Sequence, residues 1–318
     1  MGARPVQSGE GTLKYENGDT YRGEIVNNMR HGKGDHACAN GEVYSGDWRF
    51  DLRDGRGKMT YPTNLVYEGE WKQDKAQGFG TCRYPDGSVY EGEWLDDQRW
   101  GWGKLQVPAR PNATKSAGVT ANGAAAGWDV TANGSEQRRG EGGERANGSD
   151  RIAECYEGEW KNNVPDGKGR YVYADGSTFE GEYEAGKRVR GKFTSLTEPS
   201  CEYDGSWEND QRHGFGTYFE RGAIKYAGEW KSDKKHGRGR AEYADGVSYD
   251  GEWKEDRMEG EGRWTFGAER YVGAFRESKR SGRGVCDYED ASRYQGQWLT
   301  DQRYGQGKVS DHLTIFPL

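Results

Sequence analysis

Residues 67–71 read Tyr-Glu-Gly-Glu-Trp, and residues 90–94 read the same, 23 positions further on. The pattern aromatic-x-Gly-x-aromatic recurs along most of the chain, with Ile25 as the one aliphatic substitute at its last position. Its copies begin at Tyr21, Tyr44, Tyr67, Tyr90, Tyr156, Phe179, Tyr203, Tyr226, Tyr249, Tyr271 and Tyr294. A fixed period of this length predicts an architecture of eleven repeats, in which each repeat buries its apolar face against its neighbours.

The length and composition limit what else the chain contains. The repeats occupy most of the 318 residues, so we expect no appended catalytic domain and no enzymatic activity. Only 32% of the residues are hydrophobic, which on its own would favour disorder. The 12 Trp and 20 Tyr argue against disorder, because disordered segments are poor in aromatic residues.

The net charge and the cysteine content limit which partners and which cellular compartment we expect. The net charge of −7 provides no positive field for DNA or RNA, so we expect no nucleic-acid partner. The N-terminus has no apolar signal core, and no apolar run is long enough to span a membrane. The five cysteines suggest neither a disulfide framework nor a CxxC zinc site, which predicts a reduced, cytoplasmic protein.

Each repeat has the pattern of a β-hairpin when its first aromatic residue is counted as position 0. Gly at 2 and Trp at 4 share a strand face with that aromatic, and Gly at 11 and 13 with an aromatic at 17 form a second strand. Asp or Asn at 7 predicts a turn centred on 7 and 8. This turn would set Trp at 4 opposite Gly at 11 and Gly at 2 opposite Gly at 13, so that the indole covers a strand without side chains. Asn-Gly and Asp-Gly pairs between repeats predict type I′ turns. The predicted fold is all-β, an elongated, single-layer, twisted antiparallel sheet of tandem hairpins.

One segment interrupts the repeats. Residues 108–152 lose the period and are rich in Ala, Gly and Asn, which predicts a flexible, disordered insertion; two decayed repeats are the alternative. The expected organisation is a flexible N-terminus (1–8), a repeat array (9–107), the insertion (108–152), a second part of the array (153–308) and a C-terminal edge cap (309–318).

The repeat, Tyr-x-Gly-x-Trp-x5-His-Gly-x-Gly, resembles the MORN (membrane occupation and recognition nexus) repeat. Residues 28–34 and 234–239 match its second half almost letter for letter, and the resemblance covers roughly residues 9–104 and 154–308. The resemblance implies the hairpin fold. It also implies one of several roles: scaffolds in flagellar axonemes or protist cytoskeletal collars, tethers between membranes, or regulatory extensions of lipid kinases.

Basic residues at and around position 9 are one candidate binding surface. They would form an edge for an anionic partner, either phosphoinositide headgroups or an acidic protein surface; the alternative is that they are solvated turn residues balanced by Asp at position 7. The candidate basic edge consists of Arg30, Arg53, Arg99, Arg188, Arg212, Lys234, Lys235, His236, Arg238, Arg280 and Arg303, and it is densest between Lys231 and Arg240.

The aromatic face is the second candidate, because a single-layer sheet leaves part of it without a covering layer and Trp and Tyr are favoured at interfaces. The alternative is that curvature of the repeats closes this face. The candidate residues are Trp48, Trp71, Trp94, Trp160, Trp207, Trp230, Trp253 and Trp298.

Other chemical signals are weak. Acidic residues at position 3 recur on an exposed row, which argues against a catalytic pair of carboxylates. His31, His213 and His236 share position 10 but are too far apart for one metal ion. We therefore expect no catalytic residues, no metal and no cofactor.

These observations favour a non-enzymatic scaffold, a protein-interaction rod in a flagellar axoneme, cilium or other microtubule-based cytoskeletal structure. Its partners would be cytoskeletal or axonemal proteins, with possible self-association through the sheet edges. One alternative is a peripheral protein at the inner membrane surface that binds anionic phospholipid through the basic edge. Another alternative is a regulatory subunit of an enzyme.

Overall fold

The computed structural model describes residues 8–109 and 152–310, which form 23 β-strands assigned to one antiparallel sheet. The all-β prediction of tandem antiparallel hairpins is therefore confirmed. Within these residues there is no helix with the length and hydropathy needed to cross a membrane. The insertion predicted at 108–152 lies almost entirely outside the described residues, and residues 311–318 of the predicted edge cap lie outside them as well. Val309, also assigned to that cap, is part of the last strand.

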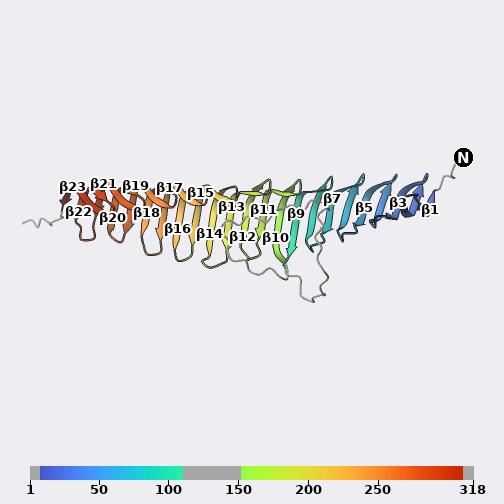
Figure 1. Cartoon of the computed structure of the whole chain (residues 1–318), viewed down its shortest axis with the longest axis horizontal. Coiled ribbons are helices and arrows are strands. Elements are labelled where there is room, and N and C mark those ends of the chain that lie inside the picture. The colour runs from blue at the N-terminus through green and yellow to red at the C-terminus, as the bar shows by residue number, and fades with distance from the viewer. Residues whose placement is uncertain (1–7, 110–151, 311–318) are drawn as a thin grey trace, which may run out of the picture. The chain divides into compact units, whose positions relative to one another are not determined.

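The chain divides into two compact units, which are described separately. The first contains described residues 8–109, 152–174 and 183–186, and its strands follow one another in chain order (Figure 1). They are β1 (Gly9–Lys14), β2 (Thr20–Val26), β3 (Met29–Ala37), β4 (Val43–Arg49), β5 (Leu52–Thr60), β6 (Val66–Lys72), β7 (Lys75–Arg83), β8 (Val89–Leu95), β9 (Gln98–Pro108), β10 (Ile152–Lys161) and β11 (Val164–Val172). Strand β1 precedes the first complete repeat and pairs with β2, in the place that the second strand of a preceding hairpin would take.

The second unit contains described residues 175–182 and 187–310, and strand β12 (Thr178–Glu184) is divided between the two units. The remaining strands are β13 (Lys187–Ser195), β14 (Cys201–Glu208), β15 (Gln211–Glu220), β16 (Ile224–Lys231), β17 (Lys234–Tyr243), β18 (Ser248–Lys254), β19 (Arg257–Phe266), β20 (Glu269–Arg276), β21 (Lys279–Asp287), β22 (Arg293–Leu299) and β23 (Gln302–Ser310).

The two kinds of turn differ from the sequence prediction. The turn inside each hairpin is centred on positions 6 and 7, as at Phe50 and Asp51, whose φ angles are 50° and 67°. Two consecutive positive φ angles define the type I′ turn, so this turn lies within the repeats and not between them. Between repeats, the amide of Gly41 donates to the carbonyl of Cys38, and only the glycine has a positive φ (92°). That pattern fits a three-residue loop with a type I turn followed by a left-handed glycine.

The register inside each hairpin also corrects the prediction. Gly46 and Gly57, at positions 2 and 13, pair as expected, but Trp48 lies opposite Arg53 and not opposite the glycine at position 11. A bulge in the second strand separates the two pairs, because four residue steps on β5 match two on β4. The predicted pairing of Trp with Gly occurs instead between neighbouring repeats, where Trp48 faces Gly32.

The paired glycines are required by tyrosine and by the close approach of the two strands, and not by tryptophan, contrary to the prediction. A Cβ atom added at Gly57 would collide with the phenol of Tyr44, and one added at Gly46 would collide with the Gly57 backbone. The Tyr44 hydroxyl donates to the backbone carbonyl of Asp47 at 3.0 Å. The glycine pair therefore makes room for a ring that lies across its own hairpin.

The core of each unit is a continuous series of edge-to-face aromatic contacts. The ring of Tyr44 lies 5.0 Å from Trp48 of its own repeat and 5.5 Å from Trp71 of the next, both nearly perpendicular. Trp71 Nε1 donates to the carbonyl of Gly57 in the preceding repeat at 3.1 Å. Edge-to-face packing is the favoured geometry for aromatic pairs, so each repeat is completed by the rings of its neighbours.

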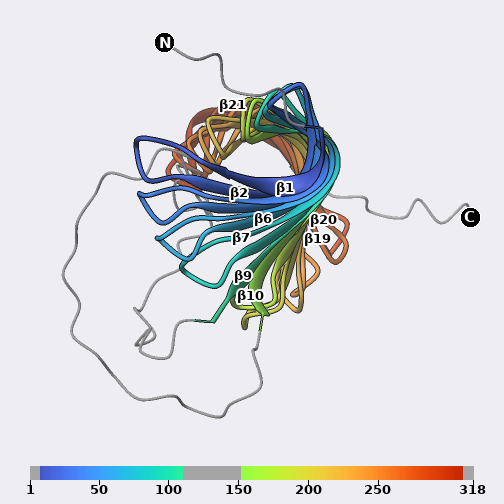
Figure 2. The same cartoon turned by 90° about the vertical axis from the view of Figure 1, so that its right-hand side faces the viewer.

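The strands curve along their length, as β1, β2, β6 and β7 show in Figure 2. A flat single layer would leave one side of the aromatic rings open to water. The eight Trp of the candidate aromatic face are instead only 2–8% exposed.

Candidate functional site

The basic side chain at position 9 joins its repeat to the next one. The guanidinium of Arg53 lies 4.3 Å from the centroid of the Trp71 ring. Its Nε donates to the carboxylate of Asp74 at 3.0 Å, and its Nη2 donates to the Asp74 backbone carbonyl at 2.8 Å. The backbones of Arg53 and Asp74 complete the contact, because each amide donates to the other residue. We call this arrangement of a basic residue with the Trp and the turn residue of the next repeat the clamp.

The clamp recurs in both units. Its basic residue lies over the next repeat's Trp at 4.0–4.8 Å in the pairs Arg30–Trp48, Arg53–Trp71, Arg99–Trp160, Arg188–Trp207, Arg212–Trp230, Lys235–Trp253 and Arg280–Trp298. A cation over an indole contributes from about 0.5 kcal/mol when exposed to about 2 kcal/mol when desolvated. Seven residues of the predicted basic edge therefore serve repeat-to-repeat packing, and a role in binding anions stays a prediction.

Arg99 is the most buried of these side chains, at 1% exposure. Its partner in the turn is Asn163, so the carboxylate found in other clamps is replaced by a neutral amide. Burial lowers the pKa of the Arg99 guanidinium, and its Nε and Nη1 atoms have no hydrogen-bond partner.

The remaining residues of the predicted basic edge do not take part in a clamp. Lys234 is exposed and pairs with Glu255 at 3.8 Å, whereas Arg238 is exposed and uses its amide to bind the Glu229 carboxylate. His236 is half-buried in β17. Arg303 belongs to the last repeat and lies over Tyr288 and Tyr294. The dense basic segment is thus interleaved with acidic partners.

The eight Trp rings are where the sequence places them, on one face, but they are packed within the array. Each Nε1 donates to a glycine carbonyl of the preceding repeat, as Trp230 does to Gly216 at 3.2 Å. Protein binding by this face stays a prediction, since the rings themselves are covered in the described structure.

The acidic residues at position 3 have a structural role. Glu93 accepts a hydrogen bond of 3.1 Å from the amide of Trp102, which the bulge in β9 leaves out of the pairing between β8 and β9. The same contact is made by Glu24, Asp47, Glu159, Glu229 and Glu252 to the residue at position 12 of the repeat. These carboxylates satisfy an otherwise unpaired backbone donor.

Sequence reasoning missed a pair of exposed aromatics on the opposite face. Phe79 and Trp102 occupy position 12 in consecutive repeats, with exposures of 59% and 51%. Phe79 pairs with Glu93 across β7 and β8, and Glu93 in turn binds the Trp102 amide, so Glu93 connects the two positions. The signal was present in the sequence, because position 12 is basic in several other repeats, for example Lys33 and Arg56.

Hollows accompany exposed aromatics on this face in each unit. In the first unit, a hollow of about 670 Å³ is lined by Phe79, Arg56, Lys58, Glu68 and Glu70 among others. In the second unit, a smaller hollow of about 360 Å³ is lined by Phe219, Lys225 and Arg240 among others. Apolar rings among charges of both signs suit a protein surface better than a uniformly anionic one.

Comparison with known proteins identifies the repeat. The MORN repeat model matches ten segments, at residues 6–20, 21–43, 44–66, 67–89, 90–106, 156–178, 203–223, 226–248, 249–267 and 271–293. The repeats that begin at Phe179 and Tyr294 are not among these segments, although each contains a hairpin strand in the structure.

Two individual proteins match the chain only in part or only weakly. MORN repeat-containing protein 3 of Xenopus laevis is 39% identical over 70 residues, which are 20% of this chain and 29% of that protein. The chain thus spans less than a third of the length of that relative. A streptogramin B lyase structure aligns over 94% of this chain and 85% of its own, with 8% identity and a TM-score of 0.13, too low to indicate a shared fold. Because the repeat model matches well over half of the sequence, this chain belongs to the MORN repeat family.

Proposed function

We propose that the chain is a non-enzymatic scaffold that binds protein partners on the face that carries Phe79 and Trp102. The observation that carries the proposal is the exposure of these two rings, 59% and 51%, in adjacent repeats of a rigidly packed array. Large aromatic side chains at the surface are characteristic of protein interfaces, because their burial provides much of the binding energy.

The clamp favours a scaffold function over a phospholipid-binding function. Seven of the predicted basic residues lie over Trp rings, and most of these also bind a turn carboxylate, so their charge is already paired. The exposed basic residues that remain include Lys234 and Arg240, which pair with Glu255 and Glu242. An anionic membrane would therefore meet a surface of mixed charge.

We further propose that the partners belong to a flagellar axoneme or another microtubule-based structure. This finer proposal rests on the resemblance to other MORN repeat proteins, which implies scaffold roles in such structures. A regulatory subunit would use the same face on a single enzyme, and it would be recognised by co-purification with that enzyme at fixed stoichiometry.

The test is localisation of the tagged protein in its own organism after detergent extraction. The informative variant combines Phe79→Lys with Trp102→Arg, because Lys33 and Arg56 occupy the same position in other repeats and the fold accommodates them. The matched control is Leu52→Lys, which replaces an exposed apolar residue elsewhere in the first unit.

Retention of the wild type and the control on the cytoskeleton, with release of the double variant, would support the proposal. Retention of the double variant would contradict the assigned face. Release of the wild type by detergent, together with flotation on vesicles that contain phosphoinositide, would contradict the scaffold and favour the membrane alternative.

A further inference from the structure

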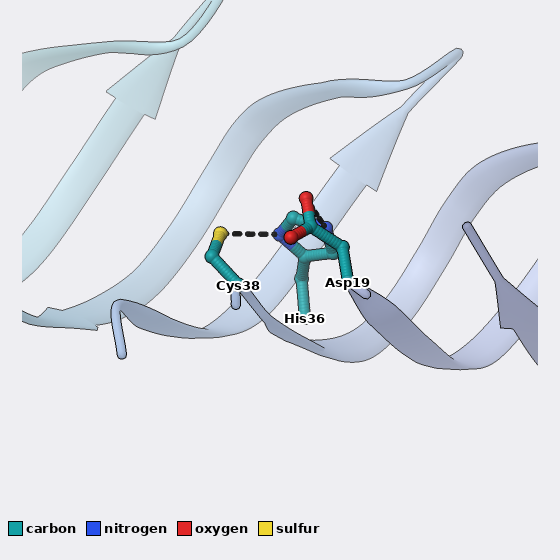
Figure 3. A group of neighbouring side chains, drawn as sticks. All are labelled: Asp19, His36 and Cys38. Carbon is teal, nitrogen blue, oxygen red and sulfur yellow. Dashed lines mark hydrogen bonds and ion pairs between the residues drawn. The ribbon is translucent and has the colours of Figure 1, made fainter. Parts of the chain in front are cut away.

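Three side chains of metal-binding type meet in the first complete repeat. Asp19 precedes β2, His36 is in β3 and Cys38 directly follows it. Tyr21 pairs with His36 and Thr20 with Ala37, so the antiparallel register places Asp19 beside Cys38. Figure 3 shows the three side chains pointing toward one another from the two neighbouring strand ends.

The array provides its own comparison for these three positions. In the repeat that begins at Tyr67 they carry Leu65, Cys82 and Tyr84. In the repeat that begins at Tyr226 they carry Ile224, Ala241 and Tyr243. Among the described repeats, only the first has a Cys, His, Asp or Glu at all three positions. The cluster is therefore an addition to the repeat and not a requirement of its fold.

The distances between the ligand atoms of the three side chains suit one small ion. Cys38 Sγ lies 3.4 Å from His36 Nδ1, and one ligand atom from each residue lies within 4.8 Å of the others. Tetrahedral Zn²⁺ with bonds of about 2.3 Å to sulfur and about 2.0–2.1 Å to nitrogen would hold these two atoms about 3.6 Å apart. The observed distance is close to that value before any ion is added.

Further contacts hold the three side chains together, in addition to the hydrogen bond between Cys38 Sγ and His36 Nδ1. Asp19 Oδ1 accepts the amide of Ala39 at 2.9 Å, which keeps Asp19 beside the imidazole, while Oδ2 lies 3.7 Å from His36 Nε2. The rings of Tyr15 and Trp48 lie nearly perpendicular to the imidazole ring, with centroid distances of 6.0 and 5.7 Å. Partners of this kind orient metal ligands and exclude competing conformations.

A reactive thiol is the rival interpretation, because the imidazole lies between a thiol and a carboxylate as it does in thiol hydrolases. Burial raises the pKa of the Cys38 thiol and lowers the pKa of the His36 imidazole. Both shifts disfavour the thiolate–imidazolium pair that such a nucleophile needs.

We propose that Asp19, His36 and Cys38 form a mononuclear Zn²⁺ site. The ligands are Cys38 Sγ, His36 Nδ1 and one Asp19 carboxylate oxygen, which moves from its contact near Nε2 to the Nδ1 side, and water takes the fourth position. Binding releases the thiol proton to solvent, and the charges of the Cys38 thiolate and the Asp19 carboxylate then neutralise the Zn²⁺ ion. The ion ties the loop before β2 to the loop after β3, at the end of the array where the first complete repeat has only β1 before it.

The test uses the full-length reduced protein and titration with Co²⁺, whose thiolate charge-transfer and d–d absorption reports tetrahedral sulfur ligation. Competition with a chromophoric chelator then gives the Zn²⁺ affinity. His36→Leu and Cys38→Ser are the site variants; Leu105 occupies the position of His36 in another repeat, so the fold accepts it. Cys155→Ser is the matched control, since that thiol is partly exposed in the same unit.

We expect one Co²⁺ per chain in the wild type and the control, and a loss of affinity of more than about 100-fold in either site variant. Zn²⁺ should also protect Cys38, but not Cys155, from alkylation as read by mass spectrometry. Far-ultraviolet circular dichroism checks that the variants are folded. Absence of the charge-transfer band in the wild type, its persistence in Cys38→Ser, or equal alkylation of Cys38 with and without Zn²⁺ would each overturn the proposal.

Discussion

Nη2 of Arg99 donates a hydrogen bond of 2.7 Å to the backbone carbonyl of Asn163, 64 positions further along the chain. The same Arg99 lies 4.5 Å from the Trp160 ring, and Trp160 Nε1 binds the Gly103 carbonyl at 3.0 Å. These are the contacts that clamp neighbouring repeats elsewhere. Strands β9 and β10 also pair from Pro108 with Ile152 to Gly101 with Trp160. The segment between them thus replaces one loop between repeats and leaves the packing of the first unit continuous.

The missing carboxylate in this clamp leads to the first prediction. Asn163→Asp should stabilise the first unit by about 1–3 kcal/mol, because the buried Arg99 would gain a charged hydrogen-bond acceptor. Other clamps already contain this arrangement, as in Arg53 with Asp74. Urea unfolding and hydrogen exchange of β9 and β10 measure the effect. An unchanged or lower stability would show that burying the added carboxylate costs as much as the new contact contributes.

Trp230→Ala should destabilise its neighbourhood by about 3–5 kcal/mol, since it removes a buried aromatic ring. The ring contacts Tyr203 and Tyr226, lies under Arg212 and binds the Gly216 carbonyl. Because each repeat depends on its neighbours, hydrogen exchange should accelerate first in β15, β16 and β17.

The control for that variant is Phe215→Ala on the adjacent strand, where the side chain is 70% exposed. It should change stability by less than about 0.5 kcal/mol. Equal effects of the two variants, or faster exchange spread evenly over all strands, would contradict stacking of the repeats by aromatic burial.

Gly57→Ala should cost about 1–3 kcal/mol by overpacking, since the new methyl group would collide with the Tyr44 phenol. A double-mutant cycle with Tyr44→Ala tests the cause, because the methyl group should be tolerated once the ring is removed. Additive losses in the double variant, measured by urea unfolding, would indicate that the close approach of the two strands sets the requirement for glycine instead.

How well a feature could be predicted from the sequence depends on how close together its residues lie along the chain. The period, the hairpins and the pairing of Gly46 with Gly57 depend on residues within one repeat, and they were predicted correctly. The clamp joins Arg53 to Asp74 across 21 positions. The solvated-turn alternative pairs Arg53 with Asp51, the residue at position 7 of its own repeat, because one repeat taken alone does not show which neighbour its side chains contact.

The bulge explains the error in register. A single repeat suggests a simple hairpin, in which Trp48 would face Gly55. Within the bulge, Gly55 has a left-handed φ (124°) and the Asp47 carboxylate accepts a hydrogen bond from the amide of Arg56. The repeat period indicates neither feature. The Asp19–His36–Cys38 cluster was missed for a related reason. His31, His213 and His236 share one position in different repeats, whereas Asp19, His36 and Cys38 occupy different positions on two neighbouring strand ends, so a comparison by repeat position does not bring them together.

Alkaline pH should unfold the array through its tyrosines. Burial raises the pKa of Tyr21 and of Tyr271 to about 12, against an unfolded value near 10. Since the folded value is higher, the contribution is fully present below about pH 10 and is lost as the pH rises toward 12, on the order of 2 kcal/mol for each residue. Tyrosinate absorbance and circular dichroism should change together. Tyr21→Phe, which copies Phe179 at the same position of another repeat, should reduce this loss. Titration of most of the tyrosines near pH 10 without unfolding would contradict the burial of the phenols.

Replacement of residues 109–151 by the loop Ala-Asn-Gly, as at 39–41, tests the continuity between β9 and β10. Pro108 and Ile152 are strand partners, so a short loop can join them without moving either strand. If the insertion makes no contacts of its own, as its sequence predicts, shortening it lowers the entropy cost of loop closure by up to about 2 kcal/mol. Urea unfolding should therefore show equal or greater stability, and hydrogen exchange of β9 and β10 should be unchanged or slower. A loss of more than about 1 kcal/mol would show that the insertion packs against the repeats and contributes to their stability.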